Sequence, residues 1–505
     1  MNTRIPRPCL AVALTLLCLL SLHSGISPAA TVDINFTELL NGDETLPSDG
    51  AYTFNSAIAP LGSQGFTAPV YRGGSAAVRF QARILEGSTP RDLGGYFVAR
   101  PTASAVATIY EDRFGVPNDT LSPTPFFGNF AFDGAHTSFG VSGFVAGLRR
   151  GGIYTNDTGF DSIVDSLATR PVALHTEPLP AAPNKRISNH DSYNINTLGD
   201  LTADDGAVAF NFTGSVNLSG GGTINSNFGA IYVWNSVDPL NSALTKIVET
   251  GDLVPDGSGG GFSSFNLGNA TLDIDGNDAV FTGRRVNAGV SEEGVYTSIG
   301  GALNLVADTG NALLNGLVTD PDRALTFTDV TTAIDDGKVA FIAKDRNTNV
   351  GAVITEGIAV AADLGNGLEL LASRNTEIPD IGGFFTSFGE AALSGETVAF
   401  LGEGSAGYQG IFAEIGGSLV NLVDTMDMLD GKAIAELRFD SEGLDGSRFA
   451  FTAVFEDGTQ SVYSADFTLA AVSEPSTLAL LTAGLVLLRW RQCAVRGRRA
   501  CSARR

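Results

Sequence analysis

The chain has 505 residues and a formal net charge of −24, and its body is more acidic still: residues 31–470 hold 22 Lys and Arg against 54 Asp and Glu, a balance of 22 − 54 = −32. A body this acidic repels nucleic acid and anionic lipid headgroups, which excludes nucleic-acid binding as the expected function. With 61 Gly, 3 Met and no long amphipathic helical stretch, the composition favours short strands joined by turns.

The first thirty residues have the three-part layout of a secretory signal peptide. Arg4 and Arg7 precede the apolar run Leu10–Leu20, and small residues follow as far as Ala29 and Ala30. The apolar run is too short to cross a bilayer as a helix. Residues 1–30 are therefore predicted to direct export, with signal peptidase cleaving near Ala29 or Ala30.

All four cysteines lie near the ends of the chain, namely Cys9, Cys18, Cys493 and Cys501. Residues 31–470 contain none. This part of the chain therefore has neither an intramolecular disulfide framework nor a Cys-ligated metal site.

A four-strand pattern repeats along residues 31–470, and its clearest copy is residues 269–309. Asp275-Gly276 and Gly300-Gly301 separate its runs in pairs and supply the positive φ angles of tight hairpins. The four β-prone runs are Ala270–Ile274, Ala279–Arg284, Gly294–Ser298 and Ala302–Ala307. A sheet this small cannot bury both faces alone, so it needs neighbours of its own kind.

The runs recur in the same order along the chain. The second run has seven copies: Ala76–Phe80, Thr137–Val141, Ala207–Phe210, Ala279–Phe281, Lys338–Phe341, Thr397–Phe400 and Arg448–Phe451. The third is found at Gly95–Val98, Gly152–Tyr154, Ala230–Val233, Gly294–Tyr296, Gly351–Ile354, Gly410–Phe412 and Ser461–Tyr463. The fourth is found at Ala105–Tyr110, Ser162–Asp165, Leu244–Glu249, Leu303–Ala307, Leu368–Ala372 and Leu419–Asp424.

The unit length and the ends of the pattern indicate how the copies assemble. A unit of about 60 residues is smaller than a β-sandwich, which takes about 100, and closing the copies into a ring removes the exposed ends. The last copy lacks a fourth run, whereas the chain begins with the unpartnered run Val32–Leu40. We therefore predict an all-β, seven-bladed β-propeller over residues 31–470, closed by this N-terminal strand. Two sequential β-sandwich domains are the alternative.

The body offers little visible chemistry. Its histidines, His136, His175 and His190, fit no zinc motif, and the chain has no GxSxG elbow, P-loop or GxGxxG followed by a helix. No catalytic, cofactor-binding or metal-ligating residue is assigned, and the protein is predicted not to be an enzyme.

Acidic clusters in the hairpins have two interpretations. They are Asp273, Asp275, Asn277 and Asp278; Asp200, Asp204 and Asp205; and Asp335 with Asp336. Asp and Asn favour turns through local hydrogen bonds, which is the preferred interpretation. Their spacing also resembles that of Ca²⁺ loops, so Ca²⁺ is the alternative to having no cofactor.

Recurring aromatic residues also have two interpretations. Packing between blades is preferred over stacking on sugar rings for Phe262, Phe265, Phe385, Phe388 and Tyr408.

The C-terminal segment, residues 471–505, has a motif, an apolar run and a basic tail. Ser473, Glu474 and Pro475 precede Leu478–Leu488, and an Arg-rich end follows. Eleven apolar residues are short for a transmembrane helix, although small neighbours and Arg snorkelling extend the reach. The arginines would hold the tail on the cytoplasmic side of the inner membrane.

This segment resembles the PEP-CTERM sorting signal of Gram-negative bacteria. Glu474 and Pro475 match the motif, while Ser473 stands where the family has its first Pro. The resemblance implies transient inner-membrane anchoring, removal of the tail by an exosortase, and delivery to the outer surface or an extracellular (biofilm) matrix, usually in species that make exopolysaccharide. The body is similar to tandem-repeat β proteins that often carry such signals.

Together these features predict an exported cell-surface or extracellular-matrix protein with a structural or binding role and exopolysaccharide as a candidate partner. A secreted carbohydrate-active hydrolase or lyase on the same scaffold is the alternative. Two or three carboxylates with an aromatic platform at one mouth of the central channel would favour that alternative. A permanently anchored docking platform, which keeps its tail, is a third hypothesis.

Overall fold

The computed structural model describes residues 32–46, 49–55, 65–86, 89–100, 107–111, 126–145, 148–156, 169–174, 178–179, 182–186, 198–217, 223–235, 244–255, 259–265, 271–287, 290–347 and 355–469. Within it, Ile34–Phe467 form one compact unit, whose fold is described here. The predicted processing residues Ala29, Ala30, Ser473, Glu474 and Pro475, and the apolar run Leu478–Leu488, lie outside the described residues. In the part that is described, no helix is long and apolar enough to cross a membrane.

Six of the larger sheets among the described residues are each built from one continuous stretch of chain. The first three contain β4 (Gly65–Phe66), β5 (Val70–Arg72), β6 (Ser75–Glu86), β7 (Thr89–Ala99) and β8 (Ala107–Glu111); β9 (Phe126–Phe132), β10 (Thr137–Val145), β11 (Leu148–Asn156) and β12 (Thr169–Leu174); and β13 (Pro178–Leu179), β14 (Ala182–Arg186), β15 (Leu198–Asp204), β16 (Ala207–Asn217), β17 (Thr223–Asn235) and β18 (Thr245–Glu249).

The next three contain β19 (Phe262–Ser264), β20 (Leu272–Asp275), β21 (Asp278–Asn287), β22 (Val290–Ile299) and β23 (Ala302–Asp308); β24 (Arg323–Thr326), β25 (Thr332–Asp335), β26 (Lys338–Asn347), β27 (Thr355–Asp363) and β28 (Leu368–Ser373); and β29 (Ser387–Ser394), β30 (Thr397–Glu403), β31 (Gln409–Ile415) and β32 (Ser418–Asp424). The one-turn helix α3 (Ala312–Asn315) lies between β23 and β24, and β2 (Thr45–Leu46) pairs with β3 (Asp49–Thr53).

One further sheet, the closing sheet, joins the two ends of the compact unit. Its strand order is β1-β37-β36-β34-β33, with β35 also paired to β36. The strands are β1 (Val32–Asn41), β33 (Met428–Leu429), β34 (Lys432–Arg438), β35 (Leu444–Asp445), β36 (Arg448–Phe455) and β37 (Gln460–Leu469). The prediction that the N-terminal run completes the last sheet is confirmed, because β1 pairs with β37.

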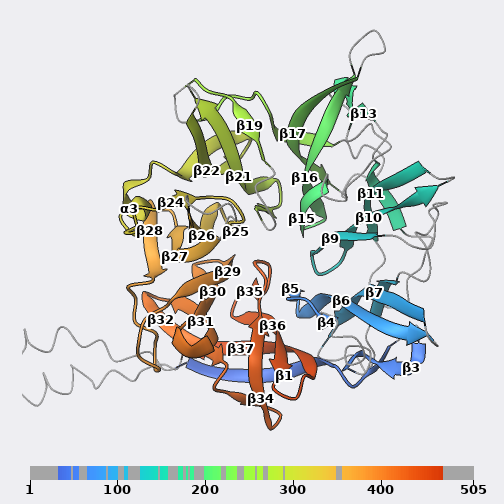
Figure 1. Cartoon of the computed structure of the whole chain (residues 1–505), viewed down its shortest axis with the longest axis vertical. Helices are drawn as coiled ribbons and strands as arrows, with labels where there is room; N and C mark the ends of the chain where they lie inside the picture. Colours follow the sequence, from blue (N-terminus) through green and yellow to red (C-terminus); the bar gives the residue numbers. More distant parts are fainter. Residues whose placement is uncertain are drawn as a thin grey trace, which may run out of the picture. The chain divides into compact units, whose positions relative to one another are not determined.

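The sheets are arranged radially around a central axis, as Figure 1 shows. Their inner strands contact one another in order, and the last contacts the first; in sequence they are β5, β9, β15, β20, β25, β29 and β35. This arrangement is an all-β propeller, which confirms the predicted fold class. The alternative of two sequential β-sandwiches is wrong, because a sandwich would stack one sheet face to face on another within each half of the chain.

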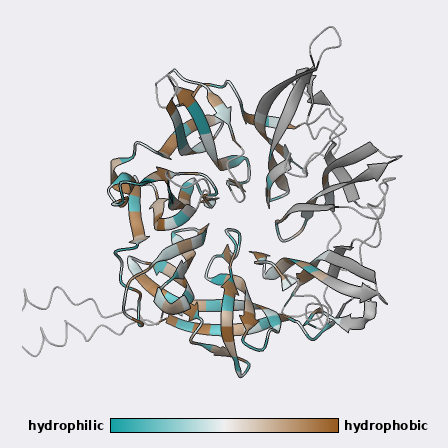
Figure 2. Cartoon of the chain, viewed as in Figure 1, coloured by the Kyte–Doolittle hydropathy of each residue, from teal (hydrophilic) through white to brown (hydrophobic). Residues whose placement is uncertain are grey.

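The hydrophobic core lies between neighbouring sheets, and the alternation of side chains along each strand explains this. In β16, Val208 and Phe210 pack with residues of β9 and β11, whereas Ala207 and Ala209 pack toward the sheet of β20–β23. Both faces of such a strand are therefore buried, and its sequence reads as continuously apolar. Hydrophobic stretches accordingly appear along the strands in Figure 2.

Two predicted runs differ in their placement, and one strand is additional. The run Ser162–Asp165 lies outside the described residues, and the fourth strand of its sheet is β12. Gly351–Ile354 also lies outside them, and β27 pairs with β26 from residue 355 onward. The first run predicted at Ala270–Ile274 corresponds to β20, and β19 is an additional strand that pairs with the opposite end of β21.

Candidate functional site in the central channel

The first hairpin turn of each repeat is an ordered contact point between sheets. Each contains a glycine at positive φ, as the turn dipeptides predict; these are Gly74, Gly134, Gly206, Gly276, Gly337, Gly395 and Gly446. A side chain before the turn accepts a hydrogen bond from a backbone N–H in the turn of the next sheet, and we call such a contact a turn latch. The latches are Gly206–Asp133 (2.8 Å), Gly276–Asp204 (2.9 Å), Asp336–Asp275 (2.6 Å), Gly395–Asp335 (2.5 Å), Gly446–Ser394 (2.9 Å) and Gly73–Asp445 (2.9 Å).

The turn latches account for most of the acidic clusters that resemble Ca²⁺ loops. Asp204, Asp275 and Asp335 each accept from the backbone of the next turn, and Asp278 accepts from Gly300 N at 2.7 Å. Among the described residues, no group of three or more His, Cys, Asp or Glu is arranged to hold a metal ion. The carboxylates therefore have backbone partners, although these lie in other turns and not in the local turn that the preferred interpretation invoked.

The other singled-out residues are structural where they are described. His136 Nδ1 lies 2.9 Å from Asp133 Oδ2 within its own turn, while His175 and His190 lie outside the described residues. The five aromatic side chains that could have stacked on sugars are at most 7 % exposed, and Phe385 and Phe412 pack edge to face with centroids 4.9 Å apart. The core-packing interpretation of these aromatic residues is confirmed.

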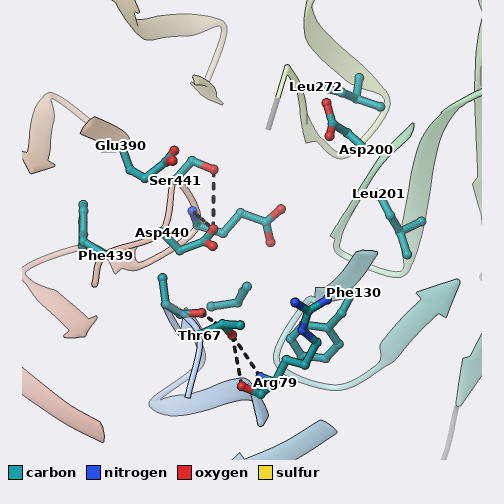
Figure 3. Close-up of a pocket in the computed structure, with 13 residues that line it drawn as sticks. Thr67, Arg79, Phe130, Asp200, Leu201, Leu272, Glu390, Phe439, Asp440 and Ser441 are labelled. Atoms are coloured by element: carbon teal, nitrogen blue, oxygen red, sulfur yellow. Dashed lines mark hydrogen bonds between the residues drawn. The ribbon is translucent and has the colours of Figure 1, made fainter. Parts of the chain in front are cut away.

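A pocket of about 310 Å³ opens from the central channel. It is lined by inner strands and loops of several sheets: Thr67, Ala68, Val70, Arg79, Phe130, Asp200, Leu201, Leu272, Glu390, Phe439, Asp440, Ser441 and Glu442. In Figure 3, Asp440, Ser441 and Glu390 lie on one side, Asp200 and Leu201 on another, and Arg79 lies beside Phe130. Four carboxyl groups and one guanidinium therefore surround this space.

Two of the carboxyl groups are held by hydrogen bonds from neighbouring sheets. Asp200 Oδ2 accepts from Thr271 N at 2.5 Å and from Thr271 Oγ1 at 2.6 Å. Glu390 Oε2 accepts a short hydrogen bond from Thr331 Oγ1. These partners fix the two carboxylates as parts of the channel wall.

Asp440 and Glu442 come from the short loop between β34 and β35. Asp440 Oδ1 accepts from Glu442 N at 3.1 Å, and Gly443 N closes the turn onto Asp440 O at 3.0 Å. Glu442 is only 6 % exposed, and its Oε2 has no hydrogen-bond partner in the structure. A buried carboxyl oxygen without a partner is rare, because it has lost its hydration without compensation.

Burial and mutual repulsion raise the pKa of these acids. Burial, and then the neighbouring Glu390 carboxylate, raise the pKa of Asp440 to about 7. Burial, and then Asp273, raise the pKa of Glu442 well above its ordinary value. Burial also raises the pKa of Asp273 to about 6, although Arg72 opposes the shift. These buried acids therefore lose their protons at higher pH than ordinary carboxyl groups.

The nearby cations compensate only part of this charge. Arg72 stands where most other repeats have the latch carboxylate, and its Nη1 donates to Leu444 O at 2.8 Å and to Glu442 O at 3.4 Å. Lys344 Nζ lies near Glu390 but donates to the carbonyl of Asp329. Arg79 is the base that lines the pocket, and its buried Nε has no hydrogen-bond partner in the structure.

The sequence contained one signal for this site that was not used. Aligned on the turn glycines, Glu442 lies four residues before Gly446, the position held by Leu272 before Gly276 and by Ala391 before Gly395. An acid at an apolar position of an inner strand marks Glu442 as unusual. Asp440 and Glu390 carry no comparable mark, since the fold brings them together from separate repeats.

Comparisons with known proteins give a family and a fold likeness. A model described as "Family of unknown function (DUF7453)" matches residues 201–474. No curated protein matches the sequence.

Among solved structures, the β-propeller domain of the Trilobed protease from Pyrococcus furiosus is similar at 8% identity and a TM-score of 0.42, over 82% of this chain and 97% of that one. The acylaminoacyl peptidase of Pyrococcus horikoshii is similar at 10% identity and a TM-score of 0.40, over 78% of this chain and 51% of that one. A mutant Trypanosoma rangeli sialidase displaying trans-sialidase activity is similar at 10% identity and a TM-score of 0.32, over 87% and 60%. None of their activities is carried over to this chain.

Proposed function

We propose that this chain, which belongs to a family of unknown function (DUF7453), is an exported cell-surface or extracellular-matrix protein. In this proposal it binds a hydroxyl-rich ligand in the channel pocket. The observation that carries the proposal is the buried Glu442, which lines the pocket and whose Oε2 has no hydrogen-bond partner among the described residues. Carboxyl oxygens accept hydrogen bonds from vicinal hydroxyl groups. The apolar walls supplied by Phe130, Phe439 and Leu272 suit the carbon face of a sugar ring.

The remaining parts of the proposal concern address and architecture. The N-terminal sequence supports export, with signal peptidase cleaving near Ala29 or Ala30. The C-terminal sequence supports transient anchoring in the inner membrane, followed by exosortase processing at Ser473, Glu474 and Pro475. Exopolysaccharide is the proposed partner in the matrix. We count the closing sheet as a seventh blade, since its inner strand β35 contacts both β29 and β5.

Binding rather than hydrolysis is favoured by the placement of the carboxyl groups. A glycoside hydrolase needs two carboxyl groups that flank the scissile bond, about 5 Å or about 6.5–9.5 Å apart. Asp440 and Glu442 come from one loop, whereas Asp200 and Glu390 are occupied by Thr271 and Thr331. A flanking pair would have to include one of these occupied groups.

A hydrolase or lyase is nevertheless the second candidate, because one observation favours it. The pKa of Asp440 is raised to about 7, which suits a general acid at neutral pH. The pocket also combines carboxyl groups with aromatic side chains at the channel.

A glycan array on the purified full-length protein tests the proposal, with release of reducing ends measured on the glycans that bind. Selective binding without release supports a binding protein. Release that is lost in Asp440→Asn, with the fold kept, would replace binding by hydrolysis as the function. Absence of binding to any glycan overturns the proposed function.

The address is tested separately by intact-mass measurement of the protein in surface and matrix fractions. A mass lacking the first 29 or 30 residues and everything after the Glu474-Pro475 region is expected. A chain that keeps its C-terminal tail would contradict exosortase processing and support the anchored platform.

A further inference from the structure

The channel pocket has an unfilled requirement for a hydrogen-bond donor. Glu442 is more than nine-tenths buried, lines the pocket and leaves Oε2 without a partner. Its backbone is fixed, since Glu442 O accepts from Tyr71 N at 2.8 Å. A donor on a ligand would relieve the cost of burying this carboxyl group.

The excess of acidic side chains around the pocket favours a cationic ligand. Four acids and one base line it, so full ionisation would give 1 − 4 = −3. The titratable groups that line it are Asp200 of β15, Glu390 of β29, Asp440 and Glu442 of the β34–β35 loop, and Arg79 of β6. Asp273 of β20, Arg72 of β5 and Lys344 of β26 act on these groups electrostatically from nearby. Burial, and then repulsion by neighbouring carboxylates, raise the pKa of Asp440 and Glu442. A bound cation would lower both pKa values again.

The size and lining of the pocket favour an organic cation over a metal ion. The volume of about 310 Å³ is at the lower end of ligand sites, which span about 300–1,000 Å³, and is too large for a bare ion. No metal-holding group of acids exists among the residues that the structure describes. An ammonium group supplies three donors, enough for Glu442 and Asp440 together.

The other wall suits the uncharged part of such a ligand. Arg79 offers an unpartnered N–H, Thr67 and Ser441 offer hydroxyl groups, and Phe130 gives an apolar surface. An acidic sugar would find one guanidinium and four carboxyl groups, so it fits this lining less well.

From these contacts we infer that the pocket recognises an amino sugar, a hydroxylated ring that carries a free primary ammonium group facing Glu442 and Asp440. This inference rests on the proposed binding function and names its ligand class. No bond is made or broken.

Calorimetric titration of the full-length protein at pH 7 tests the inference with three ligands: glucosamine oligomers with free amines, the same oligomers N-acetylated, and galacturonate oligomers. The free amine is expected to bind best, and binding should release protons, seen as a dependence of the enthalpy on the buffer. Glu442→Gln should weaken amine binding about tenfold or more, as expected when a charge-assisted hydrogen bond is lost. The control Glu369→Gln, at an exposed residue of β28, should bind as the unmodified protein does.

The outcomes separate this inference from the proposed function. Equal or tighter binding of the N-acetylated or galacturonate oligomer overturns the ammonium site while keeping a sugar-binding protein. Failure of all three oligomers and of the wider glycan array overturns both. If Glu442→Gln does not fold, the ligand series and proton release on the unmodified protein still decide.

Discussion

Asp440 links the protonation of the channel to the stability of the fold. Its folded pKa is about 7, whereas an unfolded Asp has a pKa near 3.9. Between these values the folded chain binds more protons than the unfolded chain, so the free energy of unfolding falls as pH rises. The contribution is fully present below about pH 4 and is lost as pH rises through about 7.

Replacing Asp440 by Asn should therefore flatten the pH dependence. Asn keeps an acceptor for Glu442 N but cannot ionise. We expect Asp440→Asn to gain stability over the unmodified protein on going from pH 5 to pH 8, by on the order of 1 kcal/mol. Urea unfolding at both pH values measures this, with Glu369→Gln as control. If the unfolding free energies of Asp440→Asn and the unmodified protein changed in parallel with pH, the raised pKa of Asp440 would be contradicted. Asp133 and Glu293, whose pKa values are lowered, act only at lower pH.

The first hairpins are both turns and joints between sheets. Removing one acceptor frees a single turn N–H at a partly exposed site, where water replaces part of the loss. Asp335→Ala, which loses the 2.5 Å contact with Gly395 N, should cost about 1 kcal/mol of unfolding free energy. Denaturant unfolding measures it, and Glu369→Ala at an exposed position of β28 is the control. An equal cost in both variants would mean that the latch contributes nothing.

The turn latches also predict that the acidic clusters do not bind Ca²⁺. Because Asp204, Asp275 and Asp335 already accept backbone N–H groups, they are poorly placed to bind a cation together. Adding Ca²⁺ to about 1 mM, the range of weak extracellular sites, should leave the melting temperature unchanged, and EDTA should not lower it. A melting temperature that rises with Ca²⁺ would return these clusters to metal sites.

The hairpins were predictable from sequence because their signals are local. Asp275-Gly276 and Gly300-Gly301 specify turns whatever surrounds them, and the runs beside them are rich in β-prone residues. The latches were not predictable, since a carboxylate before a turn gives no sign that its donor lies about 60 or 70 residues away. The additional strand β19 was missed for the same reason, because its pairing with the end of β21 opposite β20 is non-local.

At the scale of the whole molecule, ring closure depends on contacts between the two ends of the compact unit. Gln460 N donates to Asn55 Oδ1 at 2.8 Å, and Gln460 Oε1 accepts from Phe66 N at 2.9 Å. Leu39 and Leu40 of β1 join one hydrophobic cluster with Phe66, and with Val462 of β37. The last copy of the repeat lacks a fourth run in the sequence, and this pointed to the closure. The channel pocket could not be predicted, because its residues meet only once the ring is complete.

Leu40→Ala should weaken closure. Leu40 is fully buried, and truncating such a Leu costs about 2–5 kcal/mol. We expect a loss of this size in denaturant unfolding. Thr37→Ala, at an exposed position of the same strand, should cost little. A small effect of Leu40→Ala would mean that the ring does not rely on β1.

The closing sheet also determines when folding of the propeller can be completed. β1 is synthesised first, but its neighbour β37 is synthesised last, and the contact of Gln460 with Asn55 spans 405 residues. Such distant pairing makes completion slow. A chain cut short before β37 keeps an unpaired strand edge and an uncovered Leu40, features that expose it to aggregation and to quality-control proteases. The first strand of the propeller can therefore be paired and buried only after the final strand has been translated.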